Sequence, residues 1–365
     1  MVYFDNSATT LRKPPAVAQA AAFAIENFGN SGRSVCGAAM DAARGIYAAR
    51  AEIARLIGIN NPLAVAFTSS ATESLNLVLN GLLTPADHAI TTIAEHNSVL
   101  RTLYQTGCDI SFADCDKLEK AIKPNTKLMV ATHGSNITGN INNVEQMAEF
   151  CKSKGIIFVL DIAQTFGIIP VHISMADIFC FTGHKGLFGP QGTGGIIAQN
   201  LPPMRITKTG GSGSNSAART QPNTMPDIFE AGTANTPGIY GLLHGVQFIN
   251  NVGINTIHSR EMELLRGFYN GIKNNSKITI YGNFDNDNRL PIISINAEGI
   301  SAADFSARLW DDFAIATRAG SHCAPLLHKH FGTDKIGMLR FSFSHYNTPE
   351  EIEFGINAVN TIVGG

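Results

Sequence analysis

The sequence predicts an α/β protein, with a mostly parallel sheet flanked by helices and a smaller α+β domain toward the C-terminus. Three observations predict this fold. Short apolar runs alternate with amphipathic stretches, the runs are bounded by glycine or polar residues as buried parallel strands are, and the pattern changes after about residue 250. We expect a large domain over residues 16–250 and a small domain made of residues 1–15 with 251–365.

Apolar runs give the predicted strands in order. The large sheet takes AVAFTSS (64–70), HAITTIA (88–94), KLMVATH (127–133), GIIFVLD (155–161) and DIFCFTG (177–183). Amphipathic helices such as TESLNLVLNGLL, DKLEKAIK and NNVEQMAEFCKSKG lie between them. The small domain starts with the long helical stretch NTIHSREMELLRGFYNGIKN, continues with the strand candidates ITIYG, PIISIN and LRFSFS, and ends in a helix from Thr348.

The charge of the chain excludes several classes of partner. Its formal net charge is −2 and no block of lysine or arginine occurs, so neither nucleic acid nor an anionic membrane is indicated. No run of about 18 apolar residues is present, and the N-terminus has an acid at Asp5 instead of a positively charged lead into an apolar stretch. We expect a soluble, cytoplasmic protein that acts on a small molecule.

The six cysteines predict reduced thiols and no metal site, because none of them forms a CxxC pair. Cys151 and Cys180 lie in apolar surroundings that are typical of small buried side chains. Cys323 differs, because ATRAGSHCAP is a polar loop in which a thiol can ionise and react. The residues alone leave a nonreactive Cys323 as the alternative.

Ligands of open parallel sheets collect at the carboxyl ends of the strands. Ser70, Ala71 and Thr72 lie there between a strand and a helix, where free amides and a hydroxyl can hold a phosphate. An ordinary helix N-cap is the alternative for this segment. His96 follows the next strand, and a purely structural histidine is its alternative.

The last two strands of the large sheet end in an acid and a lysine. Asp161, with Gln164 after it, leaves a strongly apolar strand, where a carboxylate needs a cation or hydrogen bonds to stay charged. Lys185 stands in FTGHKGLFGPQGTGG, whose glycines favour sharp turns and close approach. Together these features describe a pyridoxal phosphate (PLP) site. Such a site needs a lysine amine to react with the aldehyde, an acid to pair with the pyridine nitrogen and a helix N-terminus to bind the phosphate.

With these motifs the chain resembles the class V (fold type I) PLP-dependent aminotransferase superfamily, and within it the group II cysteine desulfurases and selenocysteine lyases. The resemblance covers nearly the whole chain. It rests on FDNSATT, SSATESLN, AEHNSVL, THGSNITG, VLDIAQ, FTGHK with GPQGTGG, FEAGTANT, RAGSHCAP and LRFSFSHYNT. It implies the PLP-dependent fold type I, with the cofactor bound in the large domain.

The resemblance also implies a cofactor role for each matching residue. Lys185 would hold PLP covalently, and Asp161 would pair with its ring nitrogen. Gln164 would contact the ring hydroxyl, and His96 would stack on the ring face. The phosphate ligands would be Ala71, Thr72, Thr182 and His184, with Thr233 reaching in from a second subunit. A homodimer with shared active sites follows from the last assignment.

Substrate and reaction are implied by the C-terminal motifs. Cys323 in RAGSHC, with Arg318 in the same loop, matches the desulfurase nucleophile, and Arg340 matches the arginine that grips the substrate carboxylate. Asn136 matches the family's residue whose side chain lies beside the cofactor and the substrate. The alternative is that Asn136 only has a structural role in a turn.

The implied reaction converts L-cysteine to L-alanine. Lys185 or His96 would move the α-proton, and Cys323 would take the sulfur as a persulfide. A sulfur-acceptor protein would then take the sulfur onward.

Two residues depart from the pattern of the family. Cys36 stands where relatives commonly carry a histidine, and Ser321 replaces the first histidine of the nucleophile loop. Both would lie near the substrate. The alternatives to a cysteine desulfurase are therefore a selenocysteine lyase, a cysteine sulfinate desulfinase or another class V enzyme, such as an aminotransferase, a hydrolase or an epimerase. A noncatalytic protein on the same scaffold is disfavoured by the joint presence of Lys185, Asp161 and Arg340.

Overall fold

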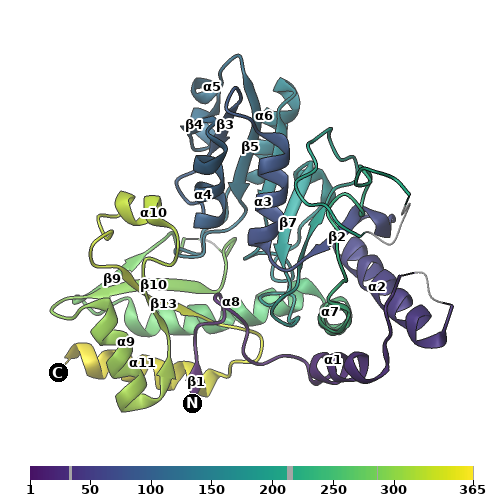
Figure 1. Cartoon of the computed structure of the whole chain (residues 1–365). Coiled ribbons are helices and arrows are strands. Elements are labelled where there is room, and N and C mark those ends of the chain that lie inside the picture. Colours follow the sequence, from purple (N-terminus) through teal and green to yellow (C-terminus); the bar gives the residue numbers. More distant parts are fainter. Residues whose placement is uncertain (33–34, 212–216, 286, 365) are drawn as a thin grey trace.

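A seven-stranded, mostly parallel sheet forms the centre of the larger lobe (Figure 1). The computed structural model describes residues 1–32, 35–211, 217–285 and 287–364. The strand order is β2-β8-β7-β6-β5-β3-β4, and β8 runs antiparallel to both of its neighbours. The strands are β2 (Val65–Thr68), β3 (His88–Thr91), β4 (Asp109–Phe112), β5 (Thr126–Thr132), β6 (Ile157–Asp161), β7 (Ile178–Thr182) and β8 (Gly194–Ile197). All five strands predicted for this sheet are confirmed.

Helices cover both faces of this sheet. One face packs against α2, α6 and α7, in a core that includes Ile53, Met147 and Leu242. The opposite face packs against α3 and α4 through Leu75 and Leu103. The helices of this lobe are α1 (Pro15–Asn27), α2 (Gly37–Leu56), α3 (Ala71–Leu82), α4 (Asn97–Thr106), α5 (Leu118–Ala121), α6 (Val144–Lys154) and α7 (Thr236–Val252). Short 3-10 helices lie at Pro62–Ala64, Cys115–Lys117 and Ile173–Met175.

The smaller lobe is built on a four-stranded antiparallel sheet of order β12-β13-β10-β9. Its strands are β9 (Ile278–Tyr281), β10 (Ile292–Ala297), β12 (Arg318–Gly320) and β13 (Met338–Ser342), and β1 (Val2–Tyr3) pairs separately with β11 (Ile315–Ala316). Its helices are α8 (Ile254–Ile272), α9 (Ala302–Phe313), α10 (Pro325–His330) and α11 (Pro349–Gly364). The predicted long helix, three strands and terminal helix of this region are confirmed.

The first residues of the chain lie in this smaller lobe, together with the C-terminus (Figure 1). Phe4 is fully buried there and packs edge-on against Phe268 and Phe343. This packing agrees with a small domain that contains residues 1–15, although the domain boundaries themselves stay a prediction. No helix within the described residues is both long and apolar enough to cross a membrane.

Candidate active site

A cavity lies at the carboxyl ends of the parallel strands, where the sequence predicts the ligand. Asp161 ends β6, Thr182 ends β7, and Ala71 and His96 stand at the starts of the helices that follow β2 and β3. The cavity contains about 510 Å³ of space that no atom fills, and it is partly open to solvent. Its lining brings together Ala71, Thr72, His96, Asn136, Asp161, Gln164, Thr182, His184 and Lys185 from the predicted set.

Lys185 needs the glycines around it because a side chain packs tightly against Gly183 and backbone packs tightly against Gly186. A Cβ on Gly183 would lie 2.2 Å from Oγ1 of Thr193, and one on Gly186 would lie 2.6 Å from the carbonyl oxygen of Phe166. The hydroxyl of Thr10, in the motif FDNSATT, donates to the Lys185 carbonyl at 2.6 Å. The N-terminal segment therefore fixes the backbone from which the lysine amine projects.

The amine of Lys185 is easier to deprotonate than an ordinary lysine. Burial lowers its pKa to about 8, against the opposing effect of the nearby Asp161 charge. A neutral amine is the form that attacks an aldehyde. Lys185 is thus suited to bind a carbonyl compound near neutral pH.

Asp161 is a buried carboxylate beside this amine. Its side chain is almost inaccessible, and burial raises its pKa while Lys185 opposes that shift. Oδ1 accepts a hydrogen bond from the Ala163 amide at 2.9 Å, and Oδ2 has no hydrogen bond to the described residues. A protonated ring nitrogen in the cavity would satisfy the second oxygen and keep the acid charged.

His96 caps a helix and also lines the cavity. Its Nδ1 accepts from the backbone amide of Ser98 at 3.1 Å as the N-cap of α4, which places the ring proton on Nε2. Burial, followed by the Lys185 charge, lowers its pKa to about 4, so the ring is neutral at pH 7. His96 therefore has a structural role as the N-cap of α4, and this role is compatible with a site at the same residue.

One end of the cavity is suited to an anion. Oγ of Ser70 caps α3 by accepting from the Glu73 amide at 3.2 Å, so this segment does form a helix N-cap, which is compatible in geometry with a phosphate site at the same helix start. The amides of Ala71 and Thr72 have no acceptor among the described residues, as expected at a helix start. Nδ1 of His184, which lines the same cavity, is buried and has no hydrogen-bond partner within the described part of the chain.

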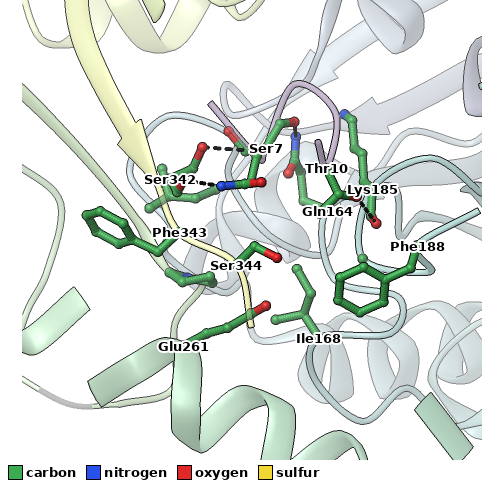
Figure 2. A pocket seen from close by; sticks show the side chains of 14 residues that line it. Ser7, Thr10, Gln164, Ile168, Lys185, Phe188, Glu261, Ser342, Phe343 and Ser344 are labelled. Atoms are coloured by element: carbon green, nitrogen blue, oxygen red, sulfur yellow. Dashed lines mark hydrogen bonds between the residues drawn. The ribbon is translucent and has the colours of Figure 1, made fainter. Parts of the chain in front are cut away.

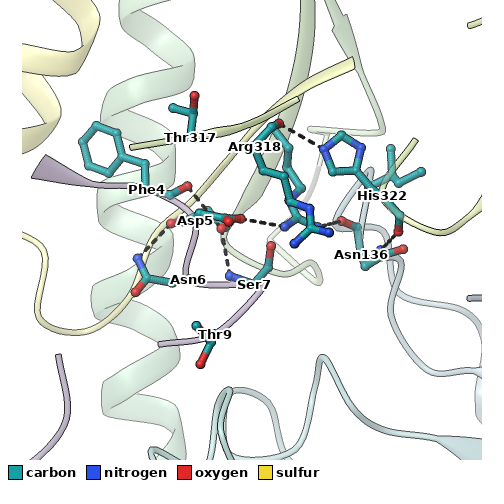
Figure 3. A network of polar contacts seen from close by, with 12 residues as sticks. Phe4, Asp5, Asn6, Ser7, Thr9, Asn136, Thr317, Arg318 and His322 are labelled. Atoms are coloured by element: carbon teal, nitrogen blue, oxygen red, sulfur yellow. Dashed lines mark hydrogen bonds and ion pairs between the residues drawn. The ribbon is translucent and has the colours of Figure 1, made fainter. Parts of the chain in front are cut away.

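Cys323, Arg340 and Arg318 lie outside the lining of the cavity. Asn136, which lines it, bonds to Arg340 and to the loop of Cys323, and Figure 3 shows Asn136 beside His322 of that loop. Arg340 is 2% exposed and donates from Nη1 to the Asn136 carbonyl at 2.8 Å. The Asn136 side chain donates to the carbonyl of His322, the residue before Cys323, at 2.7 Å. Arg318 is exposed, and its charge helps lower the pKa of Lys185.

Three other predicted residues are not brought into the cavity by this single chain. Thr233, Cys36 and Ser321 are all exposed, and none of them lines it. Within the described part of the chain, no group of three or more histidine, cysteine or acidic side chains could hold a metal ion.

Sequence reasoning missed three acids around the site. Asp5 pairs with Arg340 at 2.8 Å, although FDNSATT drew attention only as a motif. Glu95, directly before His96, is fully buried and accepts from the Thr132 amide at 3.0 Å. The sequence pattern of α8 did not predict that the Glu261 side chain would point inward.

Glu261 lines a second cavity, which Figure 2 shows beside the Lys185 backbone. It is 2% exposed, and its Oε1 accepts from the His345 amide at 2.9 Å. Its Oε2 and the hydroxyls of Ser7 and Ser344 are buried in the same cavity, and none of the three has a hydrogen-bond partner among the residues described. Burial raises the pKa of Glu261 to about 8, so its side chain is largely protonated at pH 7.

Comparison with known proteins agrees with this arrangement. The sequence profile described as aminotransferase class V matches residues 2–354. The chain belongs to the class V aminotransferase family. Its fold matches the apo structure of a cysteine desulfurase from Thermococcus onnurineus NA1, with a TM-score of 0.91, 31% identity and coverage of 100% of this chain and 95% of that one.

Two further relatives carry the same description. A probable cysteine desulfurase from Pyrococcus abyssi is 31% identical over 100% of this chain and 94% of its own length. The cysteine desulfurase CsdA from Escherichia coli, solved as an S-sulfonic acid, has a TM-score of 0.87 and 27% identity over 99% of this chain and 94% of that one. The expected PLP-dependent fold type I is confirmed by these class V structures.

Class V aminotransferases and their desulfurase members depend on PLP, and the cavity of this member fits that cofactor. Its lining offers an amine of lowered pKa, a buried carboxylate with one oxygen unpaired among the described residues, two helix amides and the imidazole of His184. These are the groups that an aldehyde, a ring nitrogen and a phosphate require.

Proposed function

We propose that this chain is a PLP-dependent cysteine desulfurase, which converts L-cysteine to L-alanine and transfers the sulfur to Cys323 as a persulfide. One observation carries the proposal. Asn136 lines the cavity with Lys185 and Asp161, while its side chain is bonded to the loop of Cys323 and its carbonyl to Arg340. Through Asn136, the cavity that contains the Lys185 amine and the Asp161 acid is connected to the Arg340 cation and to the loop that carries the Cys323 thiol. The names of the relatives support the same reaction.

The cavity residues would hold PLP in the following way. Lys185 would bind it covalently, Asp161 would face its ring nitrogen, and His96 would lie on its ring. Gln164 would contact the ring hydroxyl, and the phosphate would be bound by Ala71, Thr72, Thr182 and His184. When bound, PLP supplies an electron sink for the negative charge that develops on the substrate.

The side chains would then divide the chemical work. Arg340 would bind the substrate carboxylate through its planar guanidinium. Lys185, with its lowered pKa, would remove the α-proton, and neutral His96 would offer Nε2–H as the second proton donor.

Sulfur transfer balances without any further reagent. The Cys323 thiolate would form a bond to the substrate sulfur while the Cβ–S bond breaks, and that electron pair would stay on carbon. Protonation of this carbon completes alanine and leaves the persulfide on Cys323. Cys323 is half-buried, which would let a sulfur-acceptor protein reach it from outside.

We also propose a homodimer with shared active sites. Thr233 is exposed and outside the cavity of its own chain, which suits a residue that serves a second subunit. Large apolar side chains are exposed on α1 and α2, namely Phe23 (49%), Ile25 (71%), Met40 (43%) and Tyr47 (54%). A surface of this kind is typical of a protein interface.

We place the protein in the cytoplasm. Cys108, Cys115, Cys151, Cys180 and Cys323 are free thiols. Thiols persist in reducing compartments, where disulfides are rare.

The substrate is tested with purified, PLP-loaded protein and L-cysteine, L-selenocysteine, L-cysteine sulfinate and amino acid and keto acid pairs. With an added thiol reductant, which converts the persulfide sulfur to sulfide and is itself oxidised to a disulfide, a cysteine desulfurase releases alanine and sulfide from L-cysteine without a keto acid. Turnover of selenocysteine or the sulfinate alone would identify one of the other lyases. Products that require a keto acid would identify an aminotransferase.

A further inference from the structure

The nucleophile loop, residues 318–324, turns through two consecutive residues of left-handed backbone. The φ angles are 49° at His322 and 59° at Cys323. Residues with a Cβ rarely adopt this conformation, and they keep it only where their surroundings hold it. Because Cys323 carries the thiol, the groups that hold this turn also set the direction of the thiol.

Two hydrogen bonds from the larger lobe hold the turn. The Asn136 side chain donates to the His322 carbonyl at 2.7 Å (Figure 3), and the backbone N–H of Asn97 donates to the Cys323 carbonyl at 2.7 Å. On the other side of the turn, Nε2 of His322 is 3.0 Å from the Arg318 carbonyl. The two carbonyls on either side of the Cys323 Cα are thus fixed separately.

Asn97 is well placed to donate this bond. It is the first residue of α4, and amides in the first turn of a helix have no intrahelical acceptor. The His96 ring accepts from the Ser98 amide, which leaves the Asn97 amide for Cys323. The positive end of the helix dipole further favours a carbonyl oxygen at this point.

The end of the loop is anchored by packing. Ala324 is fully buried in a small apolar cluster with Ile137 of the larger lobe and Met338 of β13. Its amide also donates to the Ser321 carbonyl at 3.0 Å. With Ala324 anchored in this way, the Asn97 and Asn136 bonds act on the two residues before it, His322 and Cys323.

We propose that the backbone N–H of Asn97 is a positioning group that aims the Cys323 thiol toward the cavity. Together with Asn136, it keeps the two left-handed residues from relaxing into the right-handed or extended conformations that they otherwise prefer. The proposal rests on the proposed role of Cys323 as the sulfur acceptor. The Asn97 side chain itself takes no part, because it makes no hydrogen bond to the described residues.

The test removes this single N–H. Asn97→Pro does so at the first helical position, where proline is well tolerated, and His96 already has the extended backbone (φ −70°, ψ 154°) that a residue before proline prefers. Asn97→Ala keeps the N–H and is the matched control. With PLP-loaded protein and L-cysteine, we expect kcat for alanine release to be about tenfold lower in the proline variant than in the alanine variant. KM and the absorbance of bound PLP should be the same in both.

A second readout does not depend on turnover. The rate at which iodoacetamide labels Cys323, followed by mass spectrometry, should change several-fold in Asn97→Pro and remain at the wild-type value in Asn97→Ala. Wild-type protein that released no alanine would refute the proposed function, and the labelling rates would still decide the positioning role. Equal kcat and equal labelling in the two variants would overturn the proposal. If Asn97→Pro does not fold, the hydrogen-exchange rate of the Asn97 amide in the wild-type protein tests the proposal instead. Exchange as fast as in an open loop would contradict the hydrogen bond from the Asn97 amide to the Cys323 carbonyl.

Discussion

Asp5 and Arg340 form an ion pair of 2.8 Å that joins the start of the chain to β13, 335 residues away. The Arg340 side chain is 3% exposed and that of Asp5 is 17% exposed. Arg340 thus has a counter-charge within the protein before any substrate carboxylate arrives. Its Nε is buried and has no hydrogen-bond partner among the described residues.

Asp5→Asn should strengthen substrate binding and weaken the fold. The asparagine oxygen can still accept from Arg340, but the negative charge that competes with the substrate carboxylate is gone. We expect KM for L-cysteine to fall by about threefold to tenfold and the thermal midpoint to drop, because Arg340 loses its buried counter-ion. A higher KM would instead show that Asp5 serves mainly to orient Arg340.

The pH dependence of PLP uptake follows from Lys185. Its pKa is lowered to about 8 by burial, so the reactive neutral amine accumulates above that pH, well below the range of an ordinary lysine. In apo protein, the rate at which bound PLP colour appears should rise through a midpoint near pH 8. Because the Asp161 charge raises this pKa, Asp161→Asn should move the midpoint to lower pH. A midpoint near the ordinary lysine value would contradict the effect of burial.

Asp161→Asn should also separate binding from turnover. The phosphate contacts and Lys185 remain, so PLP should still bind and colour the protein. Alanine release should fall by about a hundredfold or more, because the ring nitrogen would lose the acid that keeps it protonated. Turnover close to wild type in this variant would show that Asp161 is only a structural partner.

Much of the fold and site could be predicted because the decisive signals are local. Asp161 and Lys185 each follow an apolar strand, and parallel strands bring such ends to one edge of the sheet. The strands β4 and β8 of the large sheet were missed, because DISF and GGII are short and carry polar residues or glycine. The Asp5–Arg340 pair and the inward face of Glu261 depend on packing between distant segments, which local patterns do not record.

Glu261 should give the stability of the fold a pH dependence. Its folded pKa of about 8 lies above the unfolded value of 4.5, so the folded state binds the extra proton and stability is lost as pH rises from 4.5 through 8. Glu261→Gln removes this loss. Its thermal midpoint relative to wild type should therefore increase between pH 5.5 and pH 8.5.

The control for this comparison is Glu353→Gln, on the exposed side of α11, which should follow wild type at both pH values. A constant difference between Glu261→Gln and wild type at both pH values would show that Glu261 does not titrate in this range.

Sulfur transfer to Cys323 defines the proposed reaction, and the competing nucleophile is Cys36, which is exposed near the start of α2. The most direct measurement compares alanine release from L-cysteine, without a keto acid, by PLP-loaded wild type, Cys323→Ala and Cys36→Ala, with mass spectrometry of alkylated persulfides. We predict a persulfide on Cys323, wild-type rates in Cys36→Ala, and a loss of at least about a hundredfold in Cys323→Ala with L-cysteine still bound. Full activity in Cys323→Ala would show that Cys323 does not accept the substrate sulfur.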